Sequence, residues 1–459
     1  MKKDYQTGWF ERCSYEFYFL GQLFSYGIVA GFLTLFMTES GIPAFVVSGI
    51  LLVAKIWDAV NDPLFGIVVD KAHLKGGKYK PWLKLSTILI AVTTILIFVM
   101  PQHLGVPLKA AWILVAYILW DAAYTMCDVP IFALATTMTN NIKERDSMYL
   151  IKGFFTFVGG LIVIVLIPFM YPTIGWGASA VILALAGMVF MFPIGFVAKE
   201  RHNVEKEVEP SIKELLKYLL NNKPLLVFYG ASIIACLTST GGTVSSYVAI
   251  YCLGSEKWIS YLTLLSTLPM LVSILAVQLV LKKVDKFTIW MIANFANIAL
   301  SILQYFMGYG NITALCVVLV IKSIFTSGAG VLGTMFTADC AEYGHFRSGM
   351  RAQGMAFSIQ TFTAKITGAL SGAIGMFILG LIGFVEGSGA AQTPETIRWF
   401  WKLWTIVPVI SGTIAAVFLL LAYKLPSQDA KIMAKANAGE ITREEAIAQL
   451  KYKGYDFSQ

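Results

Sequence analysis

The sequence has little charge and few of the side chains on which soluble catalytic and redox sites depend. Asp, Glu, Lys and Arg make up 14% of the 459 residues, and there are six cysteines and four histidines. The cysteines are scattered without metal or redox spacing, as small core residues would be. The histidines fall between the apolar runs, which argues against a histidine proton relay. We therefore expect no cofactor.

The sequence also lacks the polar surface of a soluble protein. Hydrophobic residues make up 57% of the chain, and the mean hydropathy is +0.70, too apolar for a soluble chain of this length. The apolar runs have the length of a membrane-spanning helix, about 20 residues. We therefore expect an all-α membrane protein of twelve transmembrane helices, near residues 13–38, 43–69, 82–101, 110–138, 148–170, 174–197, 224–252, 258–281, 287–307, 312–338, 353–384 and 399–423.

Basic residues alternate between the connections that join these runs. The even-numbered connections are rich in lysine and arginine, whereas the odd-numbered ones carry few, namely Lys109, Lys257 and Arg398. This alternation is the positive-inside pattern and predicts that both termini face the cytoplasm. The net charge of +8 therefore reflects membrane topology, and no nucleic-acid partner is expected.

The longest polar connection, residues 199–223, divides the chain into two sets of six runs. Its leucines recur at helical spacing opposite lysines, which predicts an amphipathic helix on the membrane surface. We expect a six-helix bundle over 1–198, a second over 224–424, and a cytoplasmic tail over 425–459 in which Thr442–Glu445 is a capping box before a short helix. Two six-helix bundles fit the major facilitator superfamily fold.

Ionisable side chains inside a span cost on the order of 2.5–3.5 kcal/mol each and point to function. In the second run, Asp58, Asn61 and Asp62 are spaced so that they share one helical face. Carboxylate and amide oxygens are the ligands that hard cations prefer, so this face is a candidate alkali-cation site. The alternative is that these residues pair with Lys55 and the basic loop at the cytoplasmic end.

The fourth run carries a second polar face. Asp121, Thr125 and Asp128 follow one another at helical spacing. Trp120 and Tyr124 lie beside them, and a carboxylate next to aromatic rings is typical of a sugar site. The alternative for either ring is ordinary packing.

The eleventh run contains Lys365, five residues after Gln360. A lysine inside a span needs a counter-charge, and the carboxylates of the second and fourth runs are candidates; the alternative is snorkelling to an interface. Lys322, in the tenth run, is the weaker candidate of the two lysines for a functional role. One interpretation of it is a purely structural role. Residues 327–330 lack the strand and lysine of a phosphate loop, so we expect neither an enzyme nor nucleotide-driven transport.

Five stretches that carry these residues resemble a known family. They are Ile56–Pro63, Gly77–Trp82, Tyr117–Trp120, Tyr124–Pro130, and Gln360–Thr361 with Lys365. The chain resembles, over nearly all of its membrane part, the glycoside–pentoside–hexuronide:cation symporter family, whose best-known member is the bacterial melibiose carrier.

The resemblance implies two adjoining sites. The residues that match ligands of the coupling cation are Asp58, Asn61, Asp62 and Thr125. The residues that match the sugar site or its neighbours are Asp128, Trp120, Tyr124, Phe132, Lys365 and Gln360.

Three positions depart from the melibiose carrier. The stretch Gly21-Gln22-Leu23 stands where the carrier has an acidic sugar contact in a Gly-x-Asp setting, and Gly153, next to Lys152, stands where it has an arginine. Asp121 replaces a glycine and receives no role. The cation site is therefore better supported than the identity of any sugar.

These observations predict a cation-coupled sugar or glycoside symporter that works by alternating access. We expect sodium as the coupling ion, because the four candidate ligands supply oxygens, and a monomer in the cytoplasmic membrane of a bacterium. The alternatives are proton coupling, a carrier of a lysolipid-like amphiphile, and a non-transporting membrane receptor.

Overall fold

The computed structural model describes residues 5–72, 76–202, 212–349, 353–452 and 454–455. Helices dominate these residues, and they contain no β-strand. The chain forms two compact units. Unit 1 comprises Met1–Glu207, Gly254–Tyr261 and Met376–Thr393, and unit 2 comprises Val208–Leu253, Leu262–Gly375 and Pro394–Gln459.

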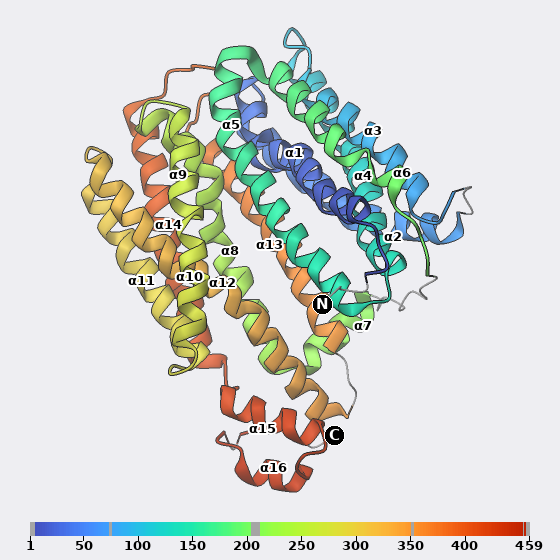
Figure 1. The fold of residues 1–459 in the computed structure, drawn as a ribbon. Helices are drawn as coiled ribbons and strands as arrows, with labels where there is room; N and C mark the ends of the chain where they lie inside the picture. The colour runs from blue at the N-terminus through green and yellow to red at the C-terminus, as the bar shows by residue number, and fades with distance from the viewer. Residues whose placement is uncertain (1–4, 73–75, 203–211, 350–352, 453, 456–459) are drawn as a thin grey trace. The chain divides into compact units, whose positions relative to one another are not determined.

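Unit 1 contains the first six helices (Figure 1). They are α1 (Trp9–Glu39), α2 (Ala44–Lys71), α3 (Lys80–Phe98), α4 (Val106–Met138), α5 (Ile142–Met191) and the short α6 (Ile194–Val197). Helix α1 packs chiefly along α5, and α4 packs against α2 and α3. The pairing of α2 with α4 is the one that positions the candidate cation residues.

Unit 2 contains most of the remaining helices, while the start of α9 and the end of α13 belong to unit 1. They are α7 (Ile212–Asn221), α8 (Lys223–Tyr247), the π-helical turn η1 (Val248–Cys252), α9 (Lys257–Thr267), α10 (Pro269–Val280), α11 (Lys286–Met307), α12 (Ile312–Ser348), α13 (Gln353–Leu381), α14 (Pro394–Ala422), α15 (Ser427–Asn437) and α16 (Arg443–Gln449). Helix α14 packs along both α8 and α11.

Side-chain caps explain where several helices begin. The side chains of Asn141, Asn222, Asp285 and Asn311 accept backbone N–H groups in the first turns of α5, α8, α11 and α12. Such caps satisfy donors that would otherwise lack partners at a helix start. The boundaries therefore follow from local sequence as well as from the apolar runs.

The expected all-α membrane fold is confirmed, whereas the number of spans is not tested to the last helix. Ten helical stretches of the described chain are long and apolar enough to cross a membrane, and α2 is not among them. One stretch, Lys143–Val197, has 55 residues. A straight helix of that length would measure about 80 Å, against a hydrocarbon core of about 30 Å. Gly175, with φ 83°, breaks it, and α5 turns back on itself (Figure 1). The exact count of twelve stays a prediction.

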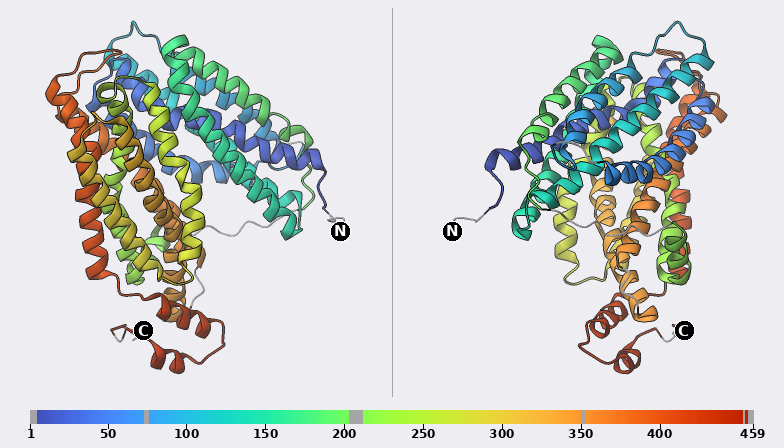
Figure 2. Two further views of the ribbon diagram at one scale, coloured as in Figure 1. Left: turned by 60° about the vertical axis from the view of Figure 1, so that its left-hand side comes forward. Right: turned by 90° about the vertical axis from the view of Figure 1, so that its right-hand side faces the viewer.

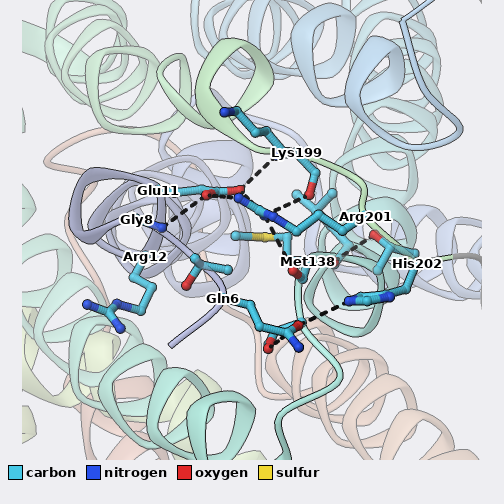
Figure 3. Close-up of polar contacts among 12 residues, drawn as sticks. Gln6, Gly8, Glu11, Arg12, Met138, Lys199, Arg201 and His202 are labelled. Carbon is cyan, nitrogen blue, oxygen red and sulfur yellow. Dashed lines mark hydrogen bonds and ion pairs between the residues drawn. The ribbon is translucent and has the colours of Figure 1, made fainter. Parts of the chain in front are cut away.

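An ion pair fastens the start of α1 to the segment after α6 (Figure 3). Two guanidinium nitrogens of Arg201 lie 2.8 and 2.9 Å from the carboxylate oxygens of Glu11. The same carboxylate accepts the backbone N–H groups of Lys199, at 2.8 Å, and Gly8, at 3.2 Å. The hydrogen bonds from its guanidinium to Glu11 raise the pKa of Arg201 above its usual value. A bidentate pair of this kind fixes geometry as well as charge.

A second carboxylate, Glu200, holds the loop before α3. It accepts the backbone N–H groups of Lys78, Tyr79 and Lys80 at 2.7, 2.9 and 3.0 Å. Gly77 has φ 122°, and a Cβ there would lie 2.5 Å from an oxygen of Glu200. This turn therefore requires glycine.

The tail packs against α12 within unit 2. Figure 2 shows α15 and α16 beyond the end of α12, and α15 packs against α12. Buried Asp429 accepts the backbone N–H groups of Lys451 and Tyr452 and the hydroxyl of Tyr455. The predicted capping box is confirmed, since the side chains of Thr442 and Glu445 each accept the other's backbone N–H.

Candidate functional site

The candidate cation residues meet where α2 packs against α4. The amide nitrogen of Asn61 lies 3.1 Å from a carboxylate oxygen of Asp121 and 2.8 Å from the hydroxyl of Thr125. All three side chains are buried, with exposed fractions of 7%, 4% and 2%. Because Asn61 donates to both partners, its amide oxygen points elsewhere. The structure thus brings together two of the predicted ligands and adds Asp121.

Asp58 takes part in an ion pair on its own helix. Its carboxylate lies 3.3 Å from the ammonium of Lys55, one turn earlier, and 16% of its side chain is exposed. This contact agrees with the alternative interpretation for that residue. The side chain of Asp62 lies outside the described residues, so its predicted place beside Asp58 is a matter of helical spacing alone.

Metal-type clusters are absent from the described residues. No group of three His, Cys, Asp or Glu side chains comes together there. The oxygens gathered around the amide nitrogen of Asn61 come instead from a hydroxyl and one carboxylate. Such a set is weakly charged and suits a monovalent cation better than a divalent one.

The aromatic residues of the candidate sugar site form a continuous surface. The rings of Trp120 and Tyr124 stack at 5.4 Å with an interplanar angle of 19°. Tyr26 of α1 lies 5.1 Å from Tyr124 and 6.4 Å from Trp120, between ring centroids. The indole of Trp120 also donates to the hydroxyl of Thr94 at 3.1 Å, which fixes the ring. Tyr26 and Thr94 are additions that the sequence did not indicate.

The carboxylate of Asp128 accepts a hydrogen bond from a residue of α1. The amide of Gln22, which is 1% exposed, donates to its carboxylate at 2.9 Å. Near it, the ammonium of Lys152 lies 3.7 Å from the ring centroid of Phe132 and 4.4 Å from that of Phe19. Gln22, in the stretch that departs from the melibiose carrier, thus contacts Asp128 directly.

The remaining predicted residues lie on α13. The amide of Gln360 is 3.5 Å from the hydroxyl of Thr334 in α12. Lys365 is exposed on the same helix. Because Lys365 belongs to unit 2 and the candidate carboxylates belong to unit 1, its counter-charge stays a prediction.

Unit 2 contains a cavity of about 750 Å³. Residues of α8, α9, α11, α12, α13 and α14 line it, among them Trp290, Asn294, Asn297, Lys322 and Trp404. Sequence reasoning had singled out Lys322 alone of these residues. A volume of this size lies within the range of small-molecule sites.

Comparison with known proteins identifies the family. Residues 15–427 match the model of the family described as MFS/sugar transport protein. The chain belongs to this family. It is 27% identical over 446 residues to the isoprimeverose transporter of Lactiplantibacillus pentosus, covering 93% of this chain and 91% of that protein.

Two further relatives come from Escherichia coli (strain K12). A putative glycoside/cation symporter, YagG, is 28% identical over 86% of each chain. A glucuronide carrier protein homolog is 26% identical over 91% of this chain and 92% of its own. The resemblance to glycoside/cation symporters is therefore confirmed, and the protein is a multi-pass membrane transporter rather than an enzyme.

Solved structures show the same fold. A bacterial homolog of the human lysosomal transporter Spinster has a TM-score of 0.67 at 11% identity, covering 93% of this chain and 99% of its own. A D-xylose-proton symporter has a TM-score of 0.56 at 14% identity, covering 90% and 98%. At these identities the likeness concerns the fold alone.

Proposed function

We propose that the protein is a sodium-coupled symporter of a sugar or glycoside that works by alternating access. The observation that carries the proposal is the buried set of oxygens around Asn61, formed by Asp121 and Thr125. Packing α2 against α4 does not require such a set. Buried polar groups inside a membrane are costly, so their presence points to function. The names of the relatives, a glycoside/cation symporter among them, support a coupling cation.

Sodium is favoured over the proton by the type of ligand. An amide oxygen and a hydroxyl can coordinate an alkali cation, whereas neither takes up a proton near neutral pH. Together with Asp58 and Asp62 on the same helical face of α2, these groups would complete an oxygen set. Proton coupling through carboxylates alone remains the second candidate.

The sugar part of the proposal rests on the aromatic surface formed by Tyr26, Trp120 and Tyr124. Sugar rings present a C–H face that packs on aromatic rings and hydroxyls that bond to carboxylates. Asp128, whose partner Gln22 comes from the same helix as Tyr26, would supply the carboxylate. Phe132 and Lys365 complete the proposed substrate residues, together with Gln360.

Coupling follows from the closeness of the two sites on α4, where Thr125 and Asp128 lie one turn apart. A cation that neutralises buried carboxylates favours the arrangement that binds sugar, and linkage requires that sugar favour the cation equally. We place the protein in a bacterial cytoplasmic membrane, as a monomer with both termini in the cytoplasm, as the basic connections indicate.

The experiment is uptake of labelled mono- and disaccharides into proteoliposomes, with and without an inward sodium gradient. We expect a sodium gradient to drive accumulation, and Thr125→Val to weaken that stimulation about tenfold. Thr136→Val is the matched control, because Thr136 lies on the same helix and its hydroxyl bonds to its own helix's backbone at Ala133.

The possible outcomes separate the alternatives. If a pH gradient drives accumulation and sodium has no effect on it, the coupling ion is the proton. Accumulation of a lysolipid in place of any sugar would change the cargo. The absence of gradient-driven uptake would contradict symport. The remaining alternative would then be a non-transporting membrane receptor.

A further inference from the structure

A second, smaller cavity of unit 2 lies where two membrane spans end beside the tail. Its volume is about 170 Å³. It is lined by Lys223, the first residue of α8, and by Ala422, the last residue of α14. Arg347 at the end of α12 and Tyr455 in the tail form further parts of its wall. Because α8 and α14 are spans, the cavity lies at a boundary between membrane and water.

Three basic side chains line this cavity, which we call the basic pocket. They are Lys223, Arg347 and Lys424. Within the described part of the chain, no Asp or Glu lines the basic pocket, and none of the ion pairs found there involves these three residues. The pocket thus gathers three positive charges from three separate elements without a carboxylate among its lining residues.

Contacts between α8 and α12 hold two of these charges in place. The side-chain amide of Asn222, the residue before Lys223, donates to the backbone carbonyl of Cys340 in α12 at 2.7 Å. The guanidinium of Arg347 donates to the backbone carbonyl of Asn221. The start of α8 is therefore fixed against α12, and Lys223 and Arg347 stay on opposite sides of one junction.

The position of Lys223 is unfavourable unless an anion is near. Cations are stabilised at the C-terminal end of a helix, as Arg347 and Lys424 are at the ends of α12 and α14. Lys223 instead stands at the start of α8, the positive end of the helix dipole. Three like charges around a small cavity also repel one another. A bound anion would remove both costs.

The tail supplies an anchored aromatic wall. The ring of Tyr455 lies 5.7 Å from that of Tyr343 and 4.9 Å from that of Tyr452, between centroids, and all three rings line the basic pocket. The hydroxyl of Tyr455 donates to Asp429 at 3.0 Å. That carboxylate also accepts two backbone N–H groups of the tail, so its hydrogen bonds serve to hold the tail.

An amphipathic helix adjoins the basic pocket. Helix α7 ends at Asn221, the residue that Arg347 contacts. Its Leu216 and Leu220 are 47% and 66% exposed, and Lys217 is exposed as well. A surface helix of this kind places its leucines among acyl chains and its lysines near headgroups. Lipid therefore has access to the surroundings of the pocket.

We propose that the basic pocket binds a negatively charged phosphate group. Arginine offers paired donors to phosphate oxygens, and lysines add point charges. An anionic phospholipid and a soluble phosphate ester present the same chemistry. The exposed leucines of α7 favour the lipid, and basic pockets between spans are known to hold anionic headgroups. This site is separate from the sugar and from the coupling ion, and its test uses neither.

The test is native mass spectrometry of the purified full-length protein, titrated with dioleoyl-phosphatidylglycerol or dioleoyl-phosphatidylcholine. These lipids share their acyl chains, but only the first has a net negative charge. We expect the protein to bind phosphatidylglycerol at least tenfold more tightly. Lys424→Gln should reduce this preference about fivefold, the usual effect of one basic residue near an anionic surface. Lys424→Arg should retain most of it.

Lys283→Gln is the matched control for general attraction between charges. Lys283 is exposed and does not line the basic pocket. It lies at the same end of unit 2, because its neighbour Asp285 lines a further cavity together with Lys424. Each variant is checked for a single peak in size-exclusion chromatography. Arg347→Gln should resemble Lys424→Gln, and if it does not fold, Lys223→Gln, at an exposed lysine, takes its place.

A second titration, with sn-glycerol 1-phosphate and inorganic phosphate, separates the two sources. We expect both to bind at least tenfold more weakly than phosphatidylglycerol. If either binds as tightly as the lipid, and Lys424→Gln weakens it, the pocket holds a soluble phosphate and the proposal stands with that source. Equal binding of the two lipids without binding of either soluble phosphate would overturn the proposal. Equal losses in Lys283→Gln and Lys424→Gln would do the same.

Discussion

The amide of Asn61 on α2 donates a hydrogen bond to the carboxylate of Asp121 on α4, with 3.1 Å between nitrogen and oxygen. This contact gives Asp121 a position in the candidate cation site. A buried carboxylate there supplies negative charge next to Thr125, whose hydroxyl accepts the other hydrogen of the same amide. The resemblance assigned no role to Asp121. The structure places it beside Asn61 and Thr125, to which the resemblance assigned a role in cation binding.

Asp121→Asn should therefore weaken sodium binding. The substitution preserves size and removes one charge, so we expect the sodium concentration for half-maximal uptake to rise about tenfold, which corresponds to about 1.4 kcal/mol. The measurement is sodium-dependent sugar uptake in proteoliposomes. Asp146→Asn, at an exposed position, controls for loss of an acidic residue. An unchanged sodium dependence would exclude Asp121 from the cation site.

Tyr26→Leu should weaken sugar binding and leave sodium binding intact. The ring of Tyr26 stands over Trp120 and Tyr124 and is 40% exposed, so it offers a face for a ligand. Loss of an aromatic contact costs about 0.5–1.5 kcal/mol beyond area, and the sugar concentration for half-maximal uptake should rise several-fold. Tyr26→Phe should behave as the natural protein. Equal losses in both variants would point to the hydroxyl instead of the ring.

Gln22→Leu should lower the stability of the protein and weaken sugar binding, because it removes a hydrogen-bond donor to Asp128. The substitution leaves a partly buried carboxylate without the amide that now donates to it at 2.9 Å, and such a loss costs about 1–3 kcal/mol. We expect a lower thermal unfolding temperature in detergent and weaker sugar binding. Gln22→Glu is informative, because it keeps the size of the side chain but places two carboxylates together. It should be rescued in part at lower pH.

Arg201→Lys should destabilise unit 1 even though it keeps the charge. Lysine cannot reproduce the two parallel hydrogen bonds to Glu11. The guanidinium is 26% exposed, and we expect a loss of about 1 kcal/mol, read as a lower unfolding temperature. Lys213→Arg, at an exposed position of α7, is the control. If the variant is as stable as the natural protein, the two parallel hydrogen bonds between Arg201 and Glu11 do not contribute to the stability of unit 1.

Gly77→Ala should destabilise the loop before α3. A methyl group would enter the space of the Glu200 carboxylate, and the backbone has a positive φ that alanine rarely adopts. The expected cost is about 1–3 kcal/mol. Gly76→Ala is the comparison, because Gly76 also has a positive φ but open space at its Cβ. The difference between the two variants isolates the clash with Glu200.

The sequence predicted features that depend on one helix at a time. Apolar length and spacing gave the helices, and the shared faces of α2 and α4 placed Asn61 and Thr125 on surfaces that could meet. Contacts with α1 were not predictable, because Gln22 and Asp128 are separated by 106 residues. A single sequence does not specify the rotation of one helix against another. The pairing of Lys365 and the role of Asp62 also stay predictions.

Asp429 has a consequence for the order in which the protein is made. Its buried carboxylate depends on donors from Lys451, Tyr452 and Tyr455, which follow it by 22, 23 and 26 residues. The base of unit 2 can therefore be completed only after these residues have been synthesised, later than the helices α1 to α14. A chain cut before Lys451 would carry an unpaired buried charge at this place.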